Sequence, residues 1–240
     1  RVPEGYIRLL RATFAGRTAE VITAYGNTAQ HHPECGLDQG EVNSPLLWLT
    51  FYDPLLTRLR ASRNGYKMRN SQQEGPPVAV AHGAFADDLT LVAESRADLQ
   101  RLADICRSFF ELHDVSVHCG KTIHTAKSPS GEEADPQLPK IRLSEGEAGL
   151  VQLVQPPSTP FRLLGCWLSL DGRSKSAFGV VKNSVEGVCR ILKRKAINGE
   201  LATYIINAVV VPAVVHKAAV LPLSDAECAT LDKMWLTLVK

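Results

Sequence analysis

The sequence lacks a cysteine framework, a long apolar run and a strong net charge. Its six cysteines are scattered with no C-x-x-C pair, which predicts reduced thiols and an intracellular protein rather than a disulfide-bonded one. The longest apolar run, residues 208–215, is eight residues long and includes Pro212, so we expect no membrane-spanning segment. Twenty-seven basic against 25 acidic residues leave a charge of +2, which excludes a strongly basic or strongly acidic tail.

Charge is distributed unevenly along this otherwise balanced chain. Residues 1–70 carry nine basic and six acidic groups, residues 71–160 carry seven and 13, and residues 161–240 carry 11 and six. An acidic middle between basic ends suits a polyanion held by the flanks around a cation-binding carboxylate centre. Ordinary scatter of surface charge produces the same pattern. With 45% hydrophobic and 22% charged residues, the chain reads as globular.

Apolar periodicity predicts mixed elements in the first half of the chain. Ser44 and Pro45 suit the N-cap and first position of a helix, and Pro54 should kink it. In chain order we expect a helix from Pro3 to Phe14, a hairpin turning at Gly26-Asn27, a helix from Ser44 to Leu59, a hairpin of residues 78–85 and 89–92, a helix from Leu99 to Phe110, and strands at 115–117 and 122–125.

The second half is expected to end in helices. Residues 128–160 contain six prolines and predict a long loop with at most short strands, and residues 161–170 predict a strand or hairpin. Helices follow at 174–196, 201–217 and 224–238, the last with Ser224 and Glu227 as a capping box. A mixed region followed by helices indicates an α+β domain with a helical appendage.

Asp87 and Asp88 interrupt the apolar hairpin. An adjacent aspartate pair arises by chance about once in a chain of this length, so the context carries the argument. Aspartate is disfavoured in strands, and two neighbouring carboxylates repel unless a cation offsets their charge. Such hard oxygen ligands suit Mg²⁺, and two such ions stabilise the attacking and leaving oxygens in phosphoryl transfer. The alternative is a solvated turn.

Four motifs follow one another in the sequence: GLDQGEVNSPLL at residues 36–47, FADDL at 85–89, VSVHCGKT at 115–122 and FRLLG at 161–165. In this order they resemble motifs of the reverse transcriptase family. The first two resemble its G-x-x-Q-G-x-x-x-S-P loop and helix and its aromatic-x-Asp-Asp catalytic hairpin. The last two resemble the short strand and Lys-Thr that follow and the primer-grip hairpin. The motif sequences are most similar to those of the polymerases of non-LTR retrotransposons.

The resemblance implies a fold and a reaction. The fold is α+β: a polymerase palm over residues 1–172, an antiparallel sheet packed on helices, and an all-helical thumb over residues 173–240. The activity is RNA-directed DNA synthesis, the transfer of a nucleotide from a dNTP to a primer 3′ end, with an RNA template and a DNA primer as partners and no membrane. Mg²⁺ is the expected cofactor, with Mn²⁺ as an alternative, and the nucleus is the expected location.

The resemblance also assigns roles. Asp87 and Asp88 would be catalytic metal ligands, and Lys121 would neutralise or protonate the leaving pyrophosphate, unless it is a solvated lysine at a strand end. The expected nucleotide pocket is formed by Gln39, Gly40, Phe85 and Ala86. The expected primer grip is Leu164 and Gly165. The expected contacts to the nucleic-acid backbone, for which a solvated helix face is the alternative, are Arg190, Lys193 and Arg194.

Helical geometry separates these three cations from the neighbouring Lys195. At 100° per residue, Arg190, Lys193 and Arg194 share one stripe and Lys195 falls at its edge. The opposite side of the same helix should pack inward. The residues expected to be buried are Val180, Val181, Val185, Val188, Ile191 and Leu192.

Departures from the family pattern leave two functions open. A further metal-binding aspartate and the fingers are expected upstream of Arg1, so this chain by itself is expected not to polymerise. His118 stands where the family often has Asn, and Asp38 and Glu41 stand where a basic and a small residue are common. The chain is therefore either part of a polymerase or a polymerase-derived module that binds nucleic acid or assembles with a partner without catalysis.

Overall fold

The computed structural model describes residues 2–33, 36–68, 77–127, 140–146, 149–151, 153–170, 172, 174–195 and 197–239. These form two compact units, Arg1–Glu94 and Ser95–Lys240, each described here by itself. Helices and two-stranded ladders occur in both units, so the α+β class is confirmed. The expected boundary between palm and thumb at residues 172 and 173 stays a prediction.

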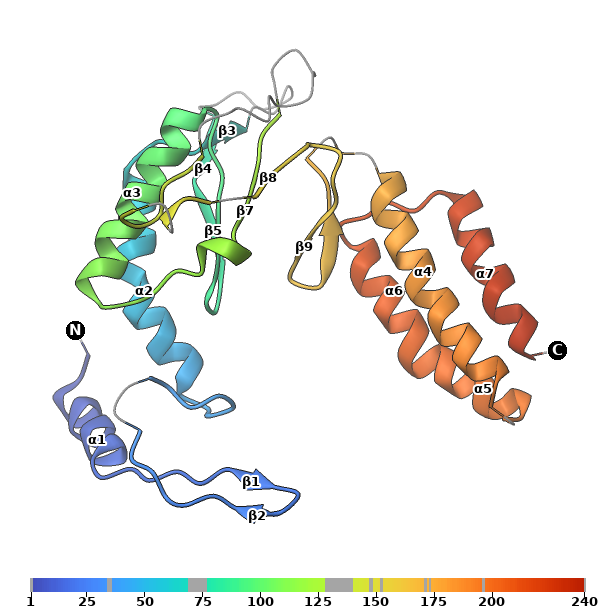
Figure 1. The fold of residues 1–240 in the computed structure, drawn as a ribbon, viewed down its shortest axis with the longest axis horizontal. Coiled ribbons are helices and arrows are strands. Elements are labelled where there is room, and N and C mark those ends of the chain that lie inside the picture. The colour runs from blue at the N-terminus through green and yellow to red at the C-terminus, as the bar shows by residue number, and fades with distance from the viewer. Residues whose placement is uncertain are drawn as a thin grey trace. The chain divides into compact units, whose positions relative to one another are not determined.

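The described residues of the first unit form two helices and three antiparallel ladders (Figure 1). Its elements are α1 (Glu4–Phe14), β1 (Ile22–Thr23), β2 (Gly26–Asn27), α2 (Ser44–Ala61), β3 (Tyr66–Met68), β4 (Val78–Val80), β5 (His82–Phe85) and β6 (Asp88–Leu91). The ladders are β1–β2, β3–β4 and β5–β6. Strand β3 was not expected from the sequence.

The first hairpin turns two residues earlier than predicted. Gly26 and Asn27 pair with Thr23 and Ile22 as strand residues, so the turn consists of Ala24 and Tyr25. The Thr23 hydroxyl explains the shift, because it donates to the carbonyl of Gly26 at 2.7 Å and accepts from the backbone N–H of Tyr25 at 3.2 Å. A threonine that bonds the local backbone in this way fixes a turn beside itself.

Helix α2 supplies the large buried side chains of the described part of the first unit. Tyr52, Leu55 and Leu59 are buried at helical spacing, and the helix continues through Pro54 on an exposed position to Ala61. Ser44 is its first helical residue rather than its N-cap. The Ser44 hydroxyl donates to the carbonyl of Asp38 at 2.8 Å, so it fastens the preceding loop instead of capping the helix.

The second unit begins with α3 (Arg96–Leu112), whose N-cap Ser95 accepts the N–H of Asp98 at 3.1 Å. The 3₁₀ turn η1 (Cys119–Lys121) leads to β7 (Ile123–Thr125), which pairs in parallel with β8 (Leu153–Gln155). The expected strand at 115–117 is wrong. Its backbone is used locally, since the N–H of Val115 bonds the last turn of α3 and the carbonyl of Val117 accepts from Cys119. Of the predicted long loop, residues 128–139, 147, 148 and 152 lie outside the described residues.

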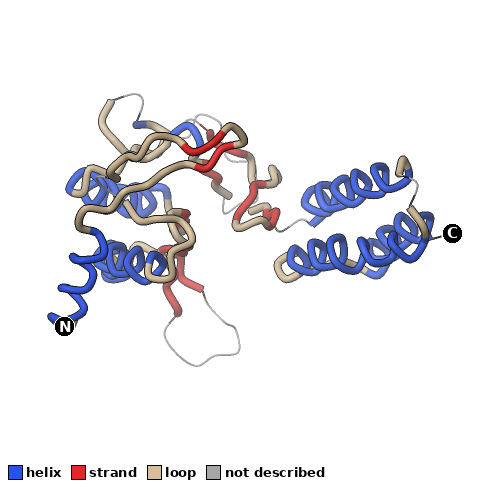
Figure 2. The backbone as a smooth tube through the Cα atoms, turned by 90° about the horizontal axis from the view of Figure 1, so that it is seen from below, coloured by secondary structure: helices blue, strands red, loops and turns tan. Residues whose placement is uncertain are grey.

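The hairpin of β9 (Phe161–Leu163) and β10 (Cys166–Leu168) precedes a helical bundle (Figure 2). The helices are α4 (Ser174–Lys193), α5 (Gly199–Ile205), the π-helical turn η3 (Ile206–Val210), α6 (Val211–Ala218) and α7 (Asp225–Val239). At the start of α7, the predicted capping box is present, because the Ser224 hydroxyl accepts from the N–H of Glu227 and the Glu227 carboxylate accepts from the N–H of Ser224.

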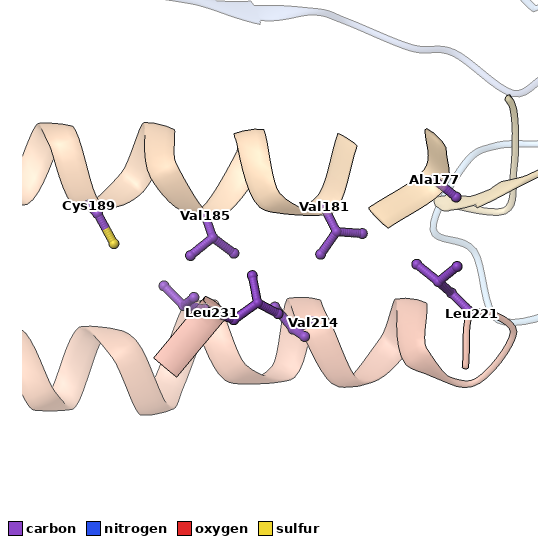
Figure 3. Close-up of a cluster of buried hydrophobic side chains, with 8 residues drawn as sticks. Ala177, Val181, Val185, Cys189, Val214, Leu221 and Leu231 are labelled. Atoms are coloured by element: carbon purple, nitrogen blue, oxygen red, sulfur yellow. The ribbon is translucent and has the colours of Figure 1, made fainter. Parts of the chain in front are cut away.

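One apolar cluster holds the bundle together (Figure 3). Its buried members are Ala177, Val181, Val185, Cys189, Val210, Val214, Leu221 and Leu231. The expected inward positions Val181, Val185 and Leu192 are buried, but Ile191 is 58% exposed, so that expectation is wrong. Cys189 takes the inward place because it lies four residues after Val185, on the same stripe of α4. Burial raises the pKa of its thiol.

The stretch Gly199–Ala218 is continuously helical. By length and composition alone, it is long and apolar enough to cross a membrane, a test that the core helix of a soluble protein also passes. Two of its residues, Val210 and Val214, belong to the apolar cluster. The expectation that no segment crosses a membrane rests on uninterrupted apolar runs and stays a prediction.

The apolar cluster predicts that two leucines of α7 contribute unequally to the free energy of unfolding. Leu231→Ala should lower the free energy of unfolding of the chain by about 2–5 kcal/mol, because it leaves a cavity at a side chain that is 2% exposed. Leu236→Ala, at a side chain that is 55% exposed, should change it by less than about 0.5 kcal/mol. Urea unfolding followed by circular dichroism measures both, and equal losses would contradict the described packing of α7.

Candidate active site

The two adjacent carboxylates lie at a tight hairpin turn. Phe85 pairs with Asp88 across β5 and β6, which leaves Ala86 and Asp87 as a two-residue loop. The predicted tip is thus one residue shorter, because Asp88 already belongs to β6. Ala86 has φ +50°, the left-handed region that a residue with a Cβ adopts only at a cost. Both aspartates are exposed, and the Phe85 side chain is 66% exposed.

A tryptophan of α2 secures this strained turn. The Trp48 Nε1–H donates to the carbonyl of Ala86, with a distance of 2.6 Å between Nε1 and the oxygen. Its ring in turn contacts that of Tyr52 at 4.8 Å between centroids, and Tyr52 is buried. A residue held in a sparsely populated conformation persists when its surroundings determine it. The turn that presents Asp87 is therefore fixed from the buried helix α2.

The loop that precedes α2 contains the expected nucleotide-pocket residues Gln39 and Gly40. Gly40 has φ +90°, and a Cβ placed there would meet nothing within 4 Å, so backbone conformation rather than crowding requires glycine. The Gln39 side chain is exposed. Because α2 begins at Ser44 and Trp48 lies one turn later, this loop and the carboxylate turn are attached to the same end of one helix.

Asp38, one of the departures from the family pattern, has a structural partner. Arg17 Nη1 lies 2.8 Å from Asp38 Oδ2, and the Arg17 side chain is only 15% exposed. The Arg17 guanidinium also lies over the Phe14 ring, 5.0 Å from its centroid. An acid at this position therefore ties the loop to the segment that follows α1.

The oxygen atoms of the carboxylate pair suit a divalent metal ion, but the pair by itself offers too few ligands for a complete site. Mg²⁺ prefers oxygen ligands and is commonly held by one or two carboxylates together with substrate phosphates. Within the described ranges, however, no three His, Cys, Asp or Glu side chains form a group that could hold a metal ion. His82, at the start of β5, has a lowered pKa because of its burial and the nearby Arg60, so a neutral imidazole is favoured there.

The remaining candidates belong to the second unit. Lys121 ends η1 and is exposed. Leu164 and Gly165 form the two-residue loop of the β9–β10 hairpin, with φ +49° and +83°. Positive φ at both positions is the pattern of a type I′ turn, which matches the twist of paired strands.

The three predicted backbone-contacting cations line a groove of about 610 Å³ between α4 and α7. Arg190, Lys193 and Arg194 are exposed, and Lys233 of α7 adds a fourth cation, whereas Glu186 is the only acid among the described residues that line the groove. Helix α4 ends at Lys193, so Arg194 lies just past the helix rather than on it.

Residues 5–168, about two thirds of the chain, match the family model described as "Reverse transcriptase (RNA-dependent DNA polymerase)". The chain belongs to the reverse transcriptase family. It is also 29% identical over 119 residues to the "Retrovirus-related Pol polyprotein from type-2 retrotransposable element R2DM" of Drosophila melanogaster. That match covers 50% of this chain and 10% of the polyprotein. The predicted family is thus confirmed.

The reverse transcriptase motifs identify the residues of the two turns but not the residues that contact these turns from the helices. The sequence motifs assign no role to Trp48, Lys233 or His216. Trp48 reaches a carbonyl 38 residues away, a distance that no local pattern reveals. A signal for Lys233 was available, since it is a cation on a helix otherwise rich in apolar residues.

The hydrogen bond from Trp48 to the carboxylate turn can be tested with Trp48→Phe, which keeps an aromatic ring and removes the N–H donor. We expect amide hydrogen exchange at Phe85 and Asp88, the pair that closes the turn, to accelerate about fivefold, which corresponds to the loss of one hydrogen bond of about 1 kcal/mol. Leu49→Ala, at an exposed neighbour on α2, serves as the control and should have a smaller effect. Unchanged exchange in Trp48→Phe would show that the turn does not need the bond.

Proposed function

We propose that the chain is the palm and thumb part of an RNA-directed DNA polymerase that transfers nucleotides from dNTPs to a primer 3′ end on an RNA template. The observation that carries this proposal is the pair Asp87 and Asp88 on a strained turn that Trp48 holds in place. Because both carboxylates are exposed, holding them on such a turn does not stabilise the fold. Their rigid presentation is useful for holding cations at a site of phosphoryl transfer.

In this proposal Asp87 and Asp88 hold Mg²⁺, or Mn²⁺, together with a third ligand from the same polypeptide. The bound ions supply charge stabilisation for the attacking primer oxygen and the leaving pyrophosphate. The rigid turn keeps the two carboxylates from reorganising during the reaction, which is the main protein contribution to this kind of catalysis. Lys121 is proposed to neutralise or protonate the pyrophosphate.

Substrate positioning is proposed to fall to three surfaces. Gln39 offers a neutral donor and acceptor to the incoming nucleotide, next to the backbone of Gly40 and beside Phe85 and Ala86. The Leu164–Gly165 turn is proposed to align the primer end. The groove between α4 and α7 is proposed to follow the phosphate backbone, with Lys233 joining Arg190, Lys193 and Arg194.

A second candidate function is a module that binds nucleic acid or assembles with a partner without catalysis. The observation that favours it is the basic groove, which needs no carboxylate pair to attract a polyanion. Two variants therefore separate the two functions, because one removes a carboxylate and the other removes the groove cations.

The first test substitutes Asp87→Asn in the intact parent polypeptide, which conserves size and removes one ligand charge. Primer extension on an RNA template with Mg²⁺ should fall by a factor on the order of 10² or more, because charge stabilisation supplies much of phosphoryl-transfer catalysis. Binding of primer-template should be unchanged. The matched control is Asp53→Asn, an exposed aspartate on α2. Wild-type extension by the Asp87 variant would exclude the catalytic assignment and leave the binding module.

The second test removes the groove cations of α4 by the triple change Arg190→Ser, Lys193→Ser and Arg194→Ser in the 240-residue chain. The slope of log affinity for primer-template against log salt should become shallower by about two to three, since each phosphate contact contributes nearly one. The same charge change at the exposed residues Arg58, Arg60 and Arg101 is the control. If both triple variants change the slope equally, the groove is a solvated face.

A further inference from the structure

A histidine of α6 contacts the Leu164–Gly165 turn at two points. His216 Nε2 lies 3.3 Å from the carbonyl oxygen of Leu164 and 3.7 Å from Cys166 Sγ. The Cys166 thiol also lies 3.7 Å from the backbone carbonyl oxygen of His216. These contacts connect residues 50 and 52 positions apart in the chain, and all of them belong to the second compact unit.

The hydrogen bonds that His216 makes depend on its tautomer. In the tautomer with a hydrogen on Nε2, the ring donates to the carbonyl oxygen of Leu164, which only accepts, and the Cys166 S–H donates to the carbonyl of His216. His216 lies in the last turn of α6, where carbonyl groups lack helical partners. One consistent pair of bonds thus joins the hairpin to the end of the helix.

The turn needs such support because Leu164 has φ +49°. A branched apolar residue in the left-handed region costs roughly 1–2 kcal/mol, and Leu164 is 47% exposed, so its side chain recovers little by packing. Gly165 meets the same imidazole, because a Cβ at Gly165 would lie 3.5 Å from His216 Nε2. The ring therefore lies directly against both residues of the turn.

We propose that His216 is a positioning residue that holds the Leu164–Gly165 turn in the conformation that aligns the primer 3′ end. The inference rests on the proposed function of this turn as a primer grip. His216 does not touch the reacting atoms. It acts through the carbonyl of Leu164, and helix α6, anchored by Val214 in the apolar cluster, keeps the imidazole in place.

The test compares three replacements of His216 in the intact parent polypeptide. His216→Ala removes the donor, His216→Phe retains the ring without a donor, and His216→Gln retains an N–H donor on a flexible side chain. With an RNA template, a DNA primer and dNTPs, kcat should fall about tenfold or more for Ala and Phe, because misplacing a reacting group is costly. KM for dNTP should change less than twofold, and Gln should recover most of kcat. Val215→Ala, at an exposed neighbour on α6, is the control.

A second measurement follows the turn itself. Amide hydrogen exchange in β9 and β10 of the 240-residue chain should accelerate in His216→Ala, and Leu164→Gly added to that variant should partly restore both protection and kcat, since glycine adopts positive φ without strain. Unchanged exchange in His216→Ala overturns the inference. Accelerated exchange with unchanged kcat also overturns it. Failure of the proposed polymerase function is distinguished by Asp87→Asn, which would then leave primer extension unaffected.

Discussion

A ring nitrogen within hydrogen-bond distance of the carbonyl of a left-handed residue is the contact that both candidate turns share. Ala86 and Leu164 each occupy the first position of a two-residue hairpin loop, with φ +50° and +49°. Trp48 holds the first and His216 the second. The conformational cost at each turn, roughly 1–2 kcal/mol, is of the same size as one good hydrogen bond with its associated packing. The turns are therefore supported from helices and not by their own sequence.

In the bundle, helix α4 both packs against the apolar cluster and lines the basic groove. On α4, Val181, Val185 and Cys189 face the apolar cluster, while Arg190 and Lys193 lie on the exposed groove side. Cations near a helix C-terminus interact favourably with the carbonyl end of the helix, so these two residues stabilise α4 as well as line the groove. This dual role explains how a concentration of positive charge is tolerated there without an acidic partner at every cation.

The sequence predicted elements with strong periodicity and missed features that depend on distant contacts. Helix α3, the carboxylate hairpin and the helical end follow from local patterns, and the motif spacing identified the family. Strand β3 is only three residues long, too short for its apolar alternation to predict a strand, and it is defined by pairing with β4. The displaced turn at Ala24 and the lost strand at 115–117 reflect local hydrogen bonds. Roles of individual site residues stay predictions, since they depend on substrates.

The ion pair between Arg17 and Asp38 has a consequence for sequence divergence. Arg17 is mostly covered, so replacing Asp38 with a basic residue would remove the ion pair and bring a like charge near the guanidinium. Such a replacement should be favoured by a change at Arg17. Related elements should therefore tend to vary at these two positions jointly, even though 21 residues separate them. The loop proposed to contact the nucleotide would then evolve under a constraint imposed by the segment that follows α1.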